Sequence, residues 1–156
     1  MTERKSVLFV CLGNICRSPL AEAALRAEAA RAGLEVEVDS AGTGGWHVGQ
    51  PPDPRARAVA RRHGVAIDGL RARRVSVDDF RRFDHVVALD RDNLTALAAL
   101  RPADARARLS LLLDHVPGRE GEAVADPYYG SDDGFEVTWR EVTEGARGLI
   151  RLLRGA

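Results

Sequence analysis

The sequence has no excess charge of either sign, because its 23 Lys and Arg residues balance its 23 Asp and Glu residues. Lys5 is the only lysine, so arginine carries nearly all of the positive charge. A protein that depends on nucleic acid normally shows a clear basic excess. We therefore expect no nucleic-acid partner.

The sequence also lacks a long apolar run. The first apolar run covers residues 7–11 and is followed within two residues by a glycine, whereas a membrane-spanning helix needs about 20 apolar residues. A secretory signal needs roughly 7–15 apolar residues and a small-residue cleavage site, and this start offers neither. The sequence therefore predicts no membrane association and a cytoplasmic location.

Cysteine is scarce, since only Cys11 and Cys16 are present. A secreted disulfide-stabilised domain uses more cysteines at wider spacing, and a structural zinc site needs a second pair of ligands. The four histidines are scattered singly along the chain and supply no such pair. We expect no metal and no other cofactor.

Short apolar segments alternate with helical segments along the chain. Strands are predicted at residues 7–11, 35–39, 85–89 and 109–113, the last of which is also compatible with a helical turn, and a glycine-rich loop at 40–45. Helices are predicted at residues 18–32, 53–63, 93–101 and 135–153, the first with Ser18 as its N-cap. Such alternation indicates a parallel sheet with helices on both faces. The chain is therefore predicted to form a single α/β domain over residues 1–156, with a four-stranded parallel sheet.

Ligands of such folds bind at the carboxyl ends of the strands, which points to the loop after the first strand. This loop spans residues 11–18 and has the sequence CLGNICRS. Its backbone amides and the helix N-terminus can surround an oxyanion, and Gly13 and Asn14 suit the positive φ angles of such a curl. The Arg17 guanidinium can bind two phosphate oxygens at once. The sequence thus predicts an anion site in this loop.

Cys11 stands at the end of the strand, where its sulfur would face the anion. Helix N-terminal amides and a neighbouring guanidinium favour the thiolate, which is the nucleophilic form of cysteine. The pattern C-x5-R-S between a strand and a helix start therefore indicates a thiolate that attacks phosphorus. The alternative is a buried cysteine that merely closes the strand, beside a solvated Arg17. That alternative leaves Gly13, Asn14 and Arg17 unexplained as a group.

The string VCLGNICRSP resembles the low-molecular-weight protein tyrosine phosphatase family, and the resemblance covers most of the chain. Further matching stretches are residues 39–42 (DSAG), 49–55 (GQPPDPR), 72–73, 83–84, 89–90 with Asn93, and 126–130 (DPYYG). The family fold is a four-stranded parallel sheet with flanking helices, which agrees with the pattern above. The resemblance implies hydrolysis of protein phosphotyrosine and of small aryl phosphates.

The resemblance also implies roles for three catalytic residues. Cys11 would form a phosphocysteine intermediate, and Arg17 would bind the phosphoryl oxygens and stabilise the transition state. Asp126 would protonate the leaving phenolate and then act as the base that activates water. Without the resemblance, Asp126-Pro127 in a glycine-rich segment would be interpreted as a turn.

By the same resemblance, a phosphate-binding loop surrounds the nucleophile. Asn14, hydrogen-bonded to Ser40, would hold the loop in shape, and Ser18 would stabilise the thiolate. The residues implied to form this loop are Leu12, Gly13, Asn14, Ile15, Cys16 and Ser18.

The substrate rim would consist of Trp46, His47, Tyr128 and Tyr129. The two tyrosines would form either an aromatic wall for a substrate ring or a plug against the core. Two positions depart from the family pattern: His47 stands where many relatives have asparagine, and Leu70 replaces a common histidine. The first departure bears on substrate preference, and the second on the hydrogen bonds that support the loop.

Cys16 has two interpretations. It is either a small buried residue that fits the loop, or a redox partner that captures an oxidised Cys11 as a disulfide.

Three other functions are compatible with parts of the pattern. Arsenate reductases share the fold and the C-x5-R loop, but their chemistry needs further cysteines. Phosphoarginine phosphatases typically have threonine where Ile15 stands. A non-catalytic phosphoprotein-binding module would be expected to lose Cys11 or Asp126. The sequence therefore favours phosphotyrosine proteins as partners, with a bacterial tyrosine kinase as one candidate, and phosphate or other oxyanions as ligands of the site.

Overall fold

The computed structural model describes residues 4–128, 130 and 132–155. The strands form one parallel sheet in the order β2-β1-β3-β4. This result confirms the predicted α/β fold with a four-stranded parallel sheet. The elements along the chain are β1 (Lys5–Cys11), α1 (Arg17–Ala32), β2 (Val36–Gly42), α2 (Pro54–Arg62), α3 (Asp79–Arg82), β3 (His85–Ala88), α4 (Arg91–Leu100), β4 (Arg108–Leu111), the 3-10 helix η1 (Leu112–His115) and α5 (Asp132–Gly155).

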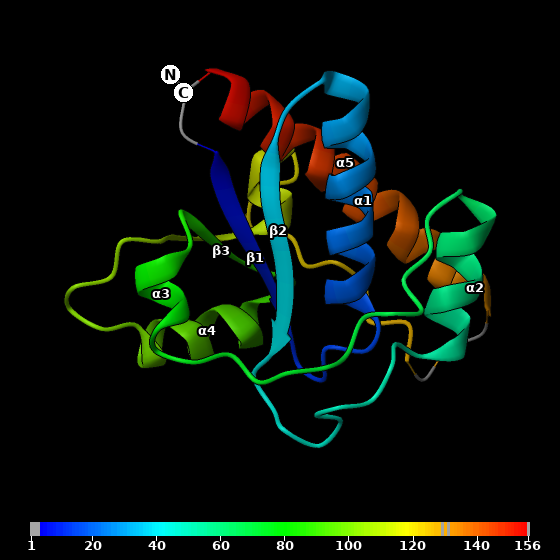
Figure 1. Cartoon of the computed structure of the whole chain (residues 1–156), viewed down its shortest axis with the longest axis horizontal. Coiled ribbons are helices and arrows are strands. Elements are labelled where there is room, and N and C mark those ends of the chain that lie inside the picture. The colour runs from blue at the N-terminus through cyan, green and yellow to red at the C-terminus, as the bar shows by residue number, and fades with distance from the viewer. Residues whose placement is uncertain (1–3, 129, 131, 156) are drawn as a thin grey trace.

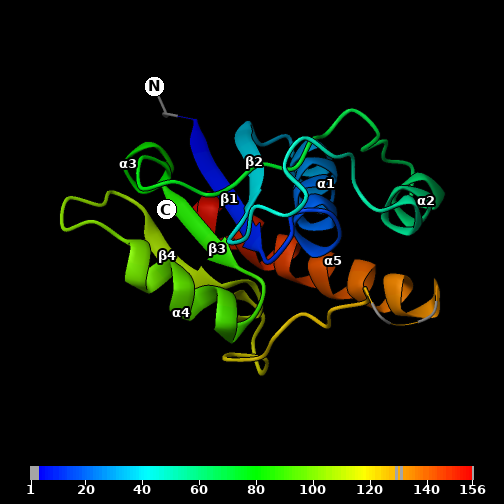
Figure 2. The same ribbon diagram turned by 90° about the horizontal axis from the view of Figure 1, so that it is seen from below.

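Two apolar clusters, one on each face of the sheet, form the core. Val7 and Phe9 of β1 belong to the cluster that includes side chains of α1, α2 and α5. Leu8 and Val10 belong to the other cluster, with side chains of α3 and α4. Figures 1 and 2 show these two groups of helices on opposite sides of the sheet. Because β1 is buried on both faces, its sequence is an unbroken apolar run rather than an alternating one.

The sheet order explains where a ligand can bind. After β1 the chain continues into α1 on one face, and after β3 it continues into α4 on the other face. The carboxyl ends of these two neighbouring strands therefore open a crevice between diverging connections, which is the usual binding position in such sheets.

Strand boundaries differ from the sequence prediction by one to three residues, and two of these differences have a clear cause. The prediction that β2 ends at residue 39 is wrong, because residues 40–42 continue to pair with the end of β1. The prediction that the fourth strand covers residues 109–113 is also wrong at its end. Residues 112–113 belong to η1, whose Asp114 carboxylate accepts a hydrogen bond from the backbone N–H of Leu111 (3.0 Å). This local hydrogen bond turns the chain out of the sheet.

Helix boundaries also differ from the sequence prediction. The prediction of Ser18 as an N-cap is wrong, because α1 begins at Arg17 with Cys16 as its N-cap. Helix α4 begins before residue 93, since the Asp90 carboxylate caps it by accepting from the backbone N–H of Asn93 (2.7 Å). Helix α5 extends beyond the predicted 135–153 at both ends, whereas α2 has Asp53 as its N-cap, as predicted.

Over the residues that the structure describes, no helix combines the length and the apolar character needed to cross a membrane.

Helix α5 packs against η1 at positions that have room only for glycine. A Cβ added at Gly148 would overlap the carbonyl oxygen of His115. We therefore expect Gly148→Ala to lower the free energy of unfolding by about 1–3 kcal/mol, although alanine is about 1 kcal/mol better than glycine inside a helix. Urea-induced unfolding followed by circular dichroism measures this change.

Gly155→Ala is the matched control, because an added Cβ there meets no atom within 4 Å. That variant should be neutral or slightly stabilised. A Gly148→Ala protein at least as stable as the wild type would contradict the packing argument.

Candidate active site

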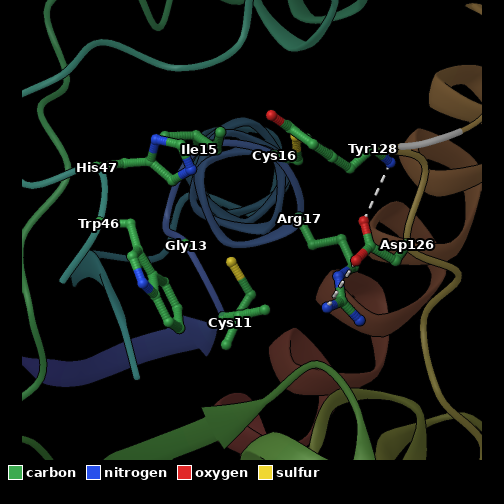
Figure 3. A pocket seen from close by; sticks show the side chains of 10 residues that line it. Cys11, Gly13, Ile15, Cys16, Arg17, Trp46, His47, Asp126 and Tyr128 are labelled. Carbon is green, nitrogen blue, oxygen red and sulfur yellow. Dashed lines mark hydrogen bonds and ion pairs between the residues drawn. The ribbon is translucent and has the colours of Figure 1, made fainter. Parts of the chain in front are cut away.

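A cavity of about 320 Å³ opens at the carboxyl end of β1. Figure 3 shows side chains from separate parts of the chain pointing into it. The structure thus brings together the loop after β1, the segment after β2 and the segment before α5. The lining residues are Cys11, Leu12, Gly13, Ile15, Cys16, Arg17, Trp46, His47, Asp126 and Tyr128.

The Cys11 sulfur points into this cavity (Figure 3) and lies within hydrogen-bond distance of two neighbouring groups. The backbone N–H of Asn14 donates to it (3.3 Å), and the Ser18 hydroxyl lies 3.0 Å away. The Asn14 side-chain amide donates to the Ser18 oxygen (2.9 Å), which leaves the Ser18 hydroxyl proton available for the sulfur. Donors directed at the sulfur stabilise a negative charge on it.

Asn14 holds the loop in its curled conformation. Its φ angle is +59°, which makes it the sole non-glycine residue with positive φ in the described part of the chain. The side-chain amide donates to Ser18 and to the Ser40 hydroxyl oxygen (3.0 Å), and its oxygen accepts from the backbone N–H of Arg73 (3.0 Å). Both amide hydrogens and the oxygen are therefore used to fix a conformation that is costly for most side chains.

The buried side chain of Glu22 supports the Asn14 amide through Ser40. The Ser40 hydroxyl donates to Glu22 (2.8 Å), whose other oxygen accepts from Arg26 (2.6 Å). Burial raises the pKa of Glu22, while the hydrogen bonds from Arg26 and Ser40 oppose this shift. Leu70, by contrast, packs against the apolar core, so the loop is supported without a polar side chain at this position.

Arg17 is buried and held by partners on two segments. One guanidinium nitrogen donates to Asp90 (2.8 Å) and to the backbone oxygen of Val124 (3.1 Å), and the other lies 3.6 Å from Asp126. The sequence alone assigns no role to Asp90. Its position directly after β3 is the signal that could have identified it, because β3 and β1 are neighbours in the sheet.

Asp126 lies in a turn, which is the usual interpretation of an Asp-Pro pair. It also lines the cavity, which the catalytic interpretation requires. One carboxylate oxygen accepts from the backbone N–H of Tyr128 (3.1 Å), and the other faces Arg17. About half of the Asp126 side chain is exposed, which gives it access to a bound substrate. Tyr128 stands beside it as part of the wall, and Tyr129 lies outside the described residues.

The opposite wall consists of Trp46 and His47. Trp46 is 72% exposed at the mouth of the cavity, close to the half-exposed Leu12. A His47 ring nitrogen is hydrogen-bonded to Gln50 (2.9 Å), and the ring packs over Gly13, where an added Cβ would lie 3.0 Å from it. The cavity therefore has a polar floor and an aromatic mouth.

Cys16 differs from Cys11 in its environment. It is buried, and burial, together with the nearby Asp53, Cys11 and Asp126, raises the pKa of its thiol far above the ordinary value. Cys16 is therefore kept as a neutral thiol. Within residues 4–128, 130 and 132–155, no group of three or more His, Cys, Asp or Glu side chains is arranged to hold a metal ion.

Comparisons with known proteins agree on one family. The family model described as low molecular weight phosphotyrosine protein phosphatase matches residues 6–155. The phosphatase of this name from Schizosaccharomyces pombe is 42% identical over 97% of this chain and 98% of its own length. A low molecular weight protein-tyrosine-phosphatase from Streptomyces coelicolor is 48% identical over 95% of this chain and 93% of its own length.

A solved structure shares the whole fold. The crystal structure of a protein tyrosine phosphatase from Entamoeba histolytica with Hepes in the active site has a TM-score of 0.91 and 35% identity, and the match covers 97% of each chain. The chain therefore belongs to the low molecular weight phosphotyrosine protein phosphatase family and is a hydrolase of protein phosphotyrosine.

Proposed function

We propose that this phosphatase acts through a phosphocysteine intermediate on Cys11, with Arg17 as the phosphoryl-binding residue and Asp126 as general acid and base. The observation that carries the proposal is the common cavity, into which the Cys11 sulfur, the Arg17 guanidinium and the Asp126 carboxylate all project (Figure 3). Hydrogen bonds from the loop to the Cys11 sulfur support its role as the nucleophile.

In the first step, the Cys11 thiolate attacks phosphorus, the S–P bond forms and the bond from phosphorus to the phenolic oxygen breaks. Asp126 gives its proton to that oxygen, so the product leaves as a neutral phenol. Its half-exposed position on the wall of the cavity suits this transfer, because the leaving oxygen must face away from the sulfur.

In the second step, Asp126 takes a proton from water as the water oxygen attacks phosphorus. The S–P bond breaks, inorganic phosphate is released and the Cys11 thiolate is restored. Ser18 and the backbone N–H of Asn14 stabilise the departing thiolate through the contacts described above.

Arg17 stabilises the charge on the phosphoryl oxygens in both steps. A planar guanidinium can bind two oxygens at once, but only when it is correctly oriented. The contacts with Asp90 and with the Val124 carbonyl fix that orientation before the substrate arrives. Preorganised charge of this kind avoids reorganisation during the reaction.

The cavity walls favour an aryl phosphate ester. Trp46 and Tyr128 offer aromatic surface near the mouth, and Ile15 offers an apolar contact where a phosphoarginine phosphatase would typically have threonine. Phosphotyrosine proteins are the substrates that the family implies, and we propose a tyrosine kinase as one of them. Hepes carries a sulfonate, so its presence in the Entamoeba active site supports our proposal that phosphate and other oxyanions bind here.

We further propose that residues 1–156 work as one catalytic domain in the cytoplasm. The match of the family model to residues 6–155 supports the first point. Thiols stay reduced in the cytoplasm, which suits a thiol nucleophile and supports the second.

The first prediction tests the nucleophile. We expect Cys11→Ser to reduce turnover of p-nitrophenyl phosphate below about 1% of the wild-type rate, because a serine hydroxyl is a much weaker nucleophile than a cysteine thiolate. Vanadate binding, measured by calorimetry, should persist because the amides and Arg17 remain. Substantial residual turnover would rule out Cys11 as the nucleophile.

The second prediction tests the general acid. We expect Asp126→Asn to lower kcat/KM by about 10²–10⁴-fold for aryl phosphates with poor leaving groups, and much less for those with good leaving groups. Asp104→Asn is the control, since this exposed carboxylate pairs with Arg81 outside the cavity. A loss that is equal for all leaving groups would indicate a structural role for Asp126.

The third prediction concerns Cys16. We expect peroxide to inactivate the enzyme reversibly, because the Cys11 sulfenic acid is captured as a disulfide with Cys16, which dithiothreitol then reduces. Cys16→Ser should be active but should not recover after peroxide treatment. Equal recovery of both proteins would show that the buried Cys16 is a packing residue only.

A further inference from the structure

Arg55 lies in the first turn of α2 and contacts the segment that carries Asp126. Its guanidinium donates hydrogen bonds to the backbone oxygens of Tyr128 (2.9 Å) and Gly130 (3.2 Å). The side chain also lies over the ring of the buried Phe135, 4.7 Å from its centroid. One side chain thus holds two carbonyl groups just after Asp126.

Asp53 fixes the position of this guanidinium. Its two carboxylate oxygens each accept one hydrogen bond from the Arg55 side chain (both 3.1 Å), and one of them also accepts from the Arg55 backbone N–H (2.8 Å). Partial burial would raise the pKa of Asp53, but the hydrogen bonds and charge of Arg55 lower it. The pair is therefore ionic at neutral pH, with a bidentate geometry that restricts the guanidinium plane.

The same pair is attached to the phosphate-binding loop. The backbone N–H of Asp53 donates to the backbone oxygen of Ile15 (2.8 Å). A short chain of contacts therefore runs from Ile15 through Asp53 and Arg55 to the carbonyl of Tyr128. It connects the loop that holds the nucleophile to the segment that holds the acid, which are far apart in sequence.

We propose that Arg55 is a positioning residue for Asp126. It touches none of the reacting atoms, and it acts by fixing the distance of the Asp126 carboxyl group from the leaving oxygen. Proton transfer requires hydrogen-bond reach, and a displacement of about 1 Å in an active site can cost about 10²-fold in rate. Because the Asp126 side chain is half-exposed, burial does little to fix its position. Hydrogen bonds to the backbone of its segment must therefore hold it in place. This inference rests on the proposed role of Asp126.

The experiment compares Arg55→Leu with the wild type over a series of aryl phosphates. We expect kcat/KM to fall about 10–100-fold for the poorest leaving group and to change little for the best one, because a good leaving group needs little protonation. Arg61→Leu is the matched control on the same helix, since Arg61 pairs with Asp68 (3.0 Å) on the surface. In that variant, kcat/KM should depend on the leaving group as it does in the wild type.

Two further variants separate positioning from a general structural effect. Arg55→Lys keeps the charge but not the bidentate fork, so its leaving-group dependence should be intermediate. In the Asp126→Asn background, Arg55→Leu should cause no further loss for poor leaving groups, because the group it positions is absent. Thermal unfolding checks that each variant is folded.

The possible outcomes distinguish the two proposals. An equal loss for all leaving groups in Arg55→Leu, or an undiminished loss in the Asp126→Asn background, would overturn the role of Arg55. Wild-type behaviour of Arg55→Leu would overturn it as well. If Asp126→Asn alone showed no leaving-group dependence, the general-acid assignment itself would fail.

Discussion

The active site depends on one backbone conformation, the positive φ angle at Asn14. In that conformation the backbone N–H of Asn14 faces the Cys11 sulfur, and three side-chain hydrogen bonds of the same residue compensate its cost. The partners come from α1, from β2 and from the segment after α2, so the loop keeps its shape only when the surrounding fold is complete. Packing of α1 and β2 on β1 is therefore a requirement for the anion site as well as for stability.

The buried charge of Arg17 has partners before a substrate binds. Arg17 is almost fully buried, and a lone guanidinium in such a place would be costly. Asp90 at 2.8 Å and Asp126 at 3.6 Å offset its charge, and both come from segments that meet at the carboxyl edge of the sheet. In the proposed mechanism, a phosphoryl group takes over part of this contact with Arg17, so Asp126 can carry a proton while Asp90 continues to orient Arg17. Under that proposal, Asp90 serves the structure and Asp126 serves the chemistry.

The features that the sequence predicted correctly are those that depend on local chemistry. The buried run of β1, the strand-to-helix loop and the parallel sheet follow from apolar patterning and turn residues. The errors arise where a particular side-chain hydrogen bond decides the boundary: Ser18 is a good N-cap by type, but its hydroxyl is used by Cys11 and Asn14. The roles of Asp90 and Arg55 depend on which strands and loops become neighbours, and residue patterns along one segment do not specify this.

The contacts of Asn14 show why the loop needs no polar side chain at position 70, where Leu70 stands. The Asn14 oxygen accepts from the backbone N–H of Arg73, and a backbone donor does not depend on the residue type at that position. This strand-like segment is itself fixed, because Ala72 exchanges hydrogen bonds with Gly49 and Gln50, and Arg73 accepts from Gly42. Because the Asn14 oxygen already accepts this hydrogen bond, it needs no donor from the side chain at position 70. Leucine then adds apolar packing against the core, while the backbone N–H of Arg73 helps to fix the Asn14 side chain that holds the curl of the loop.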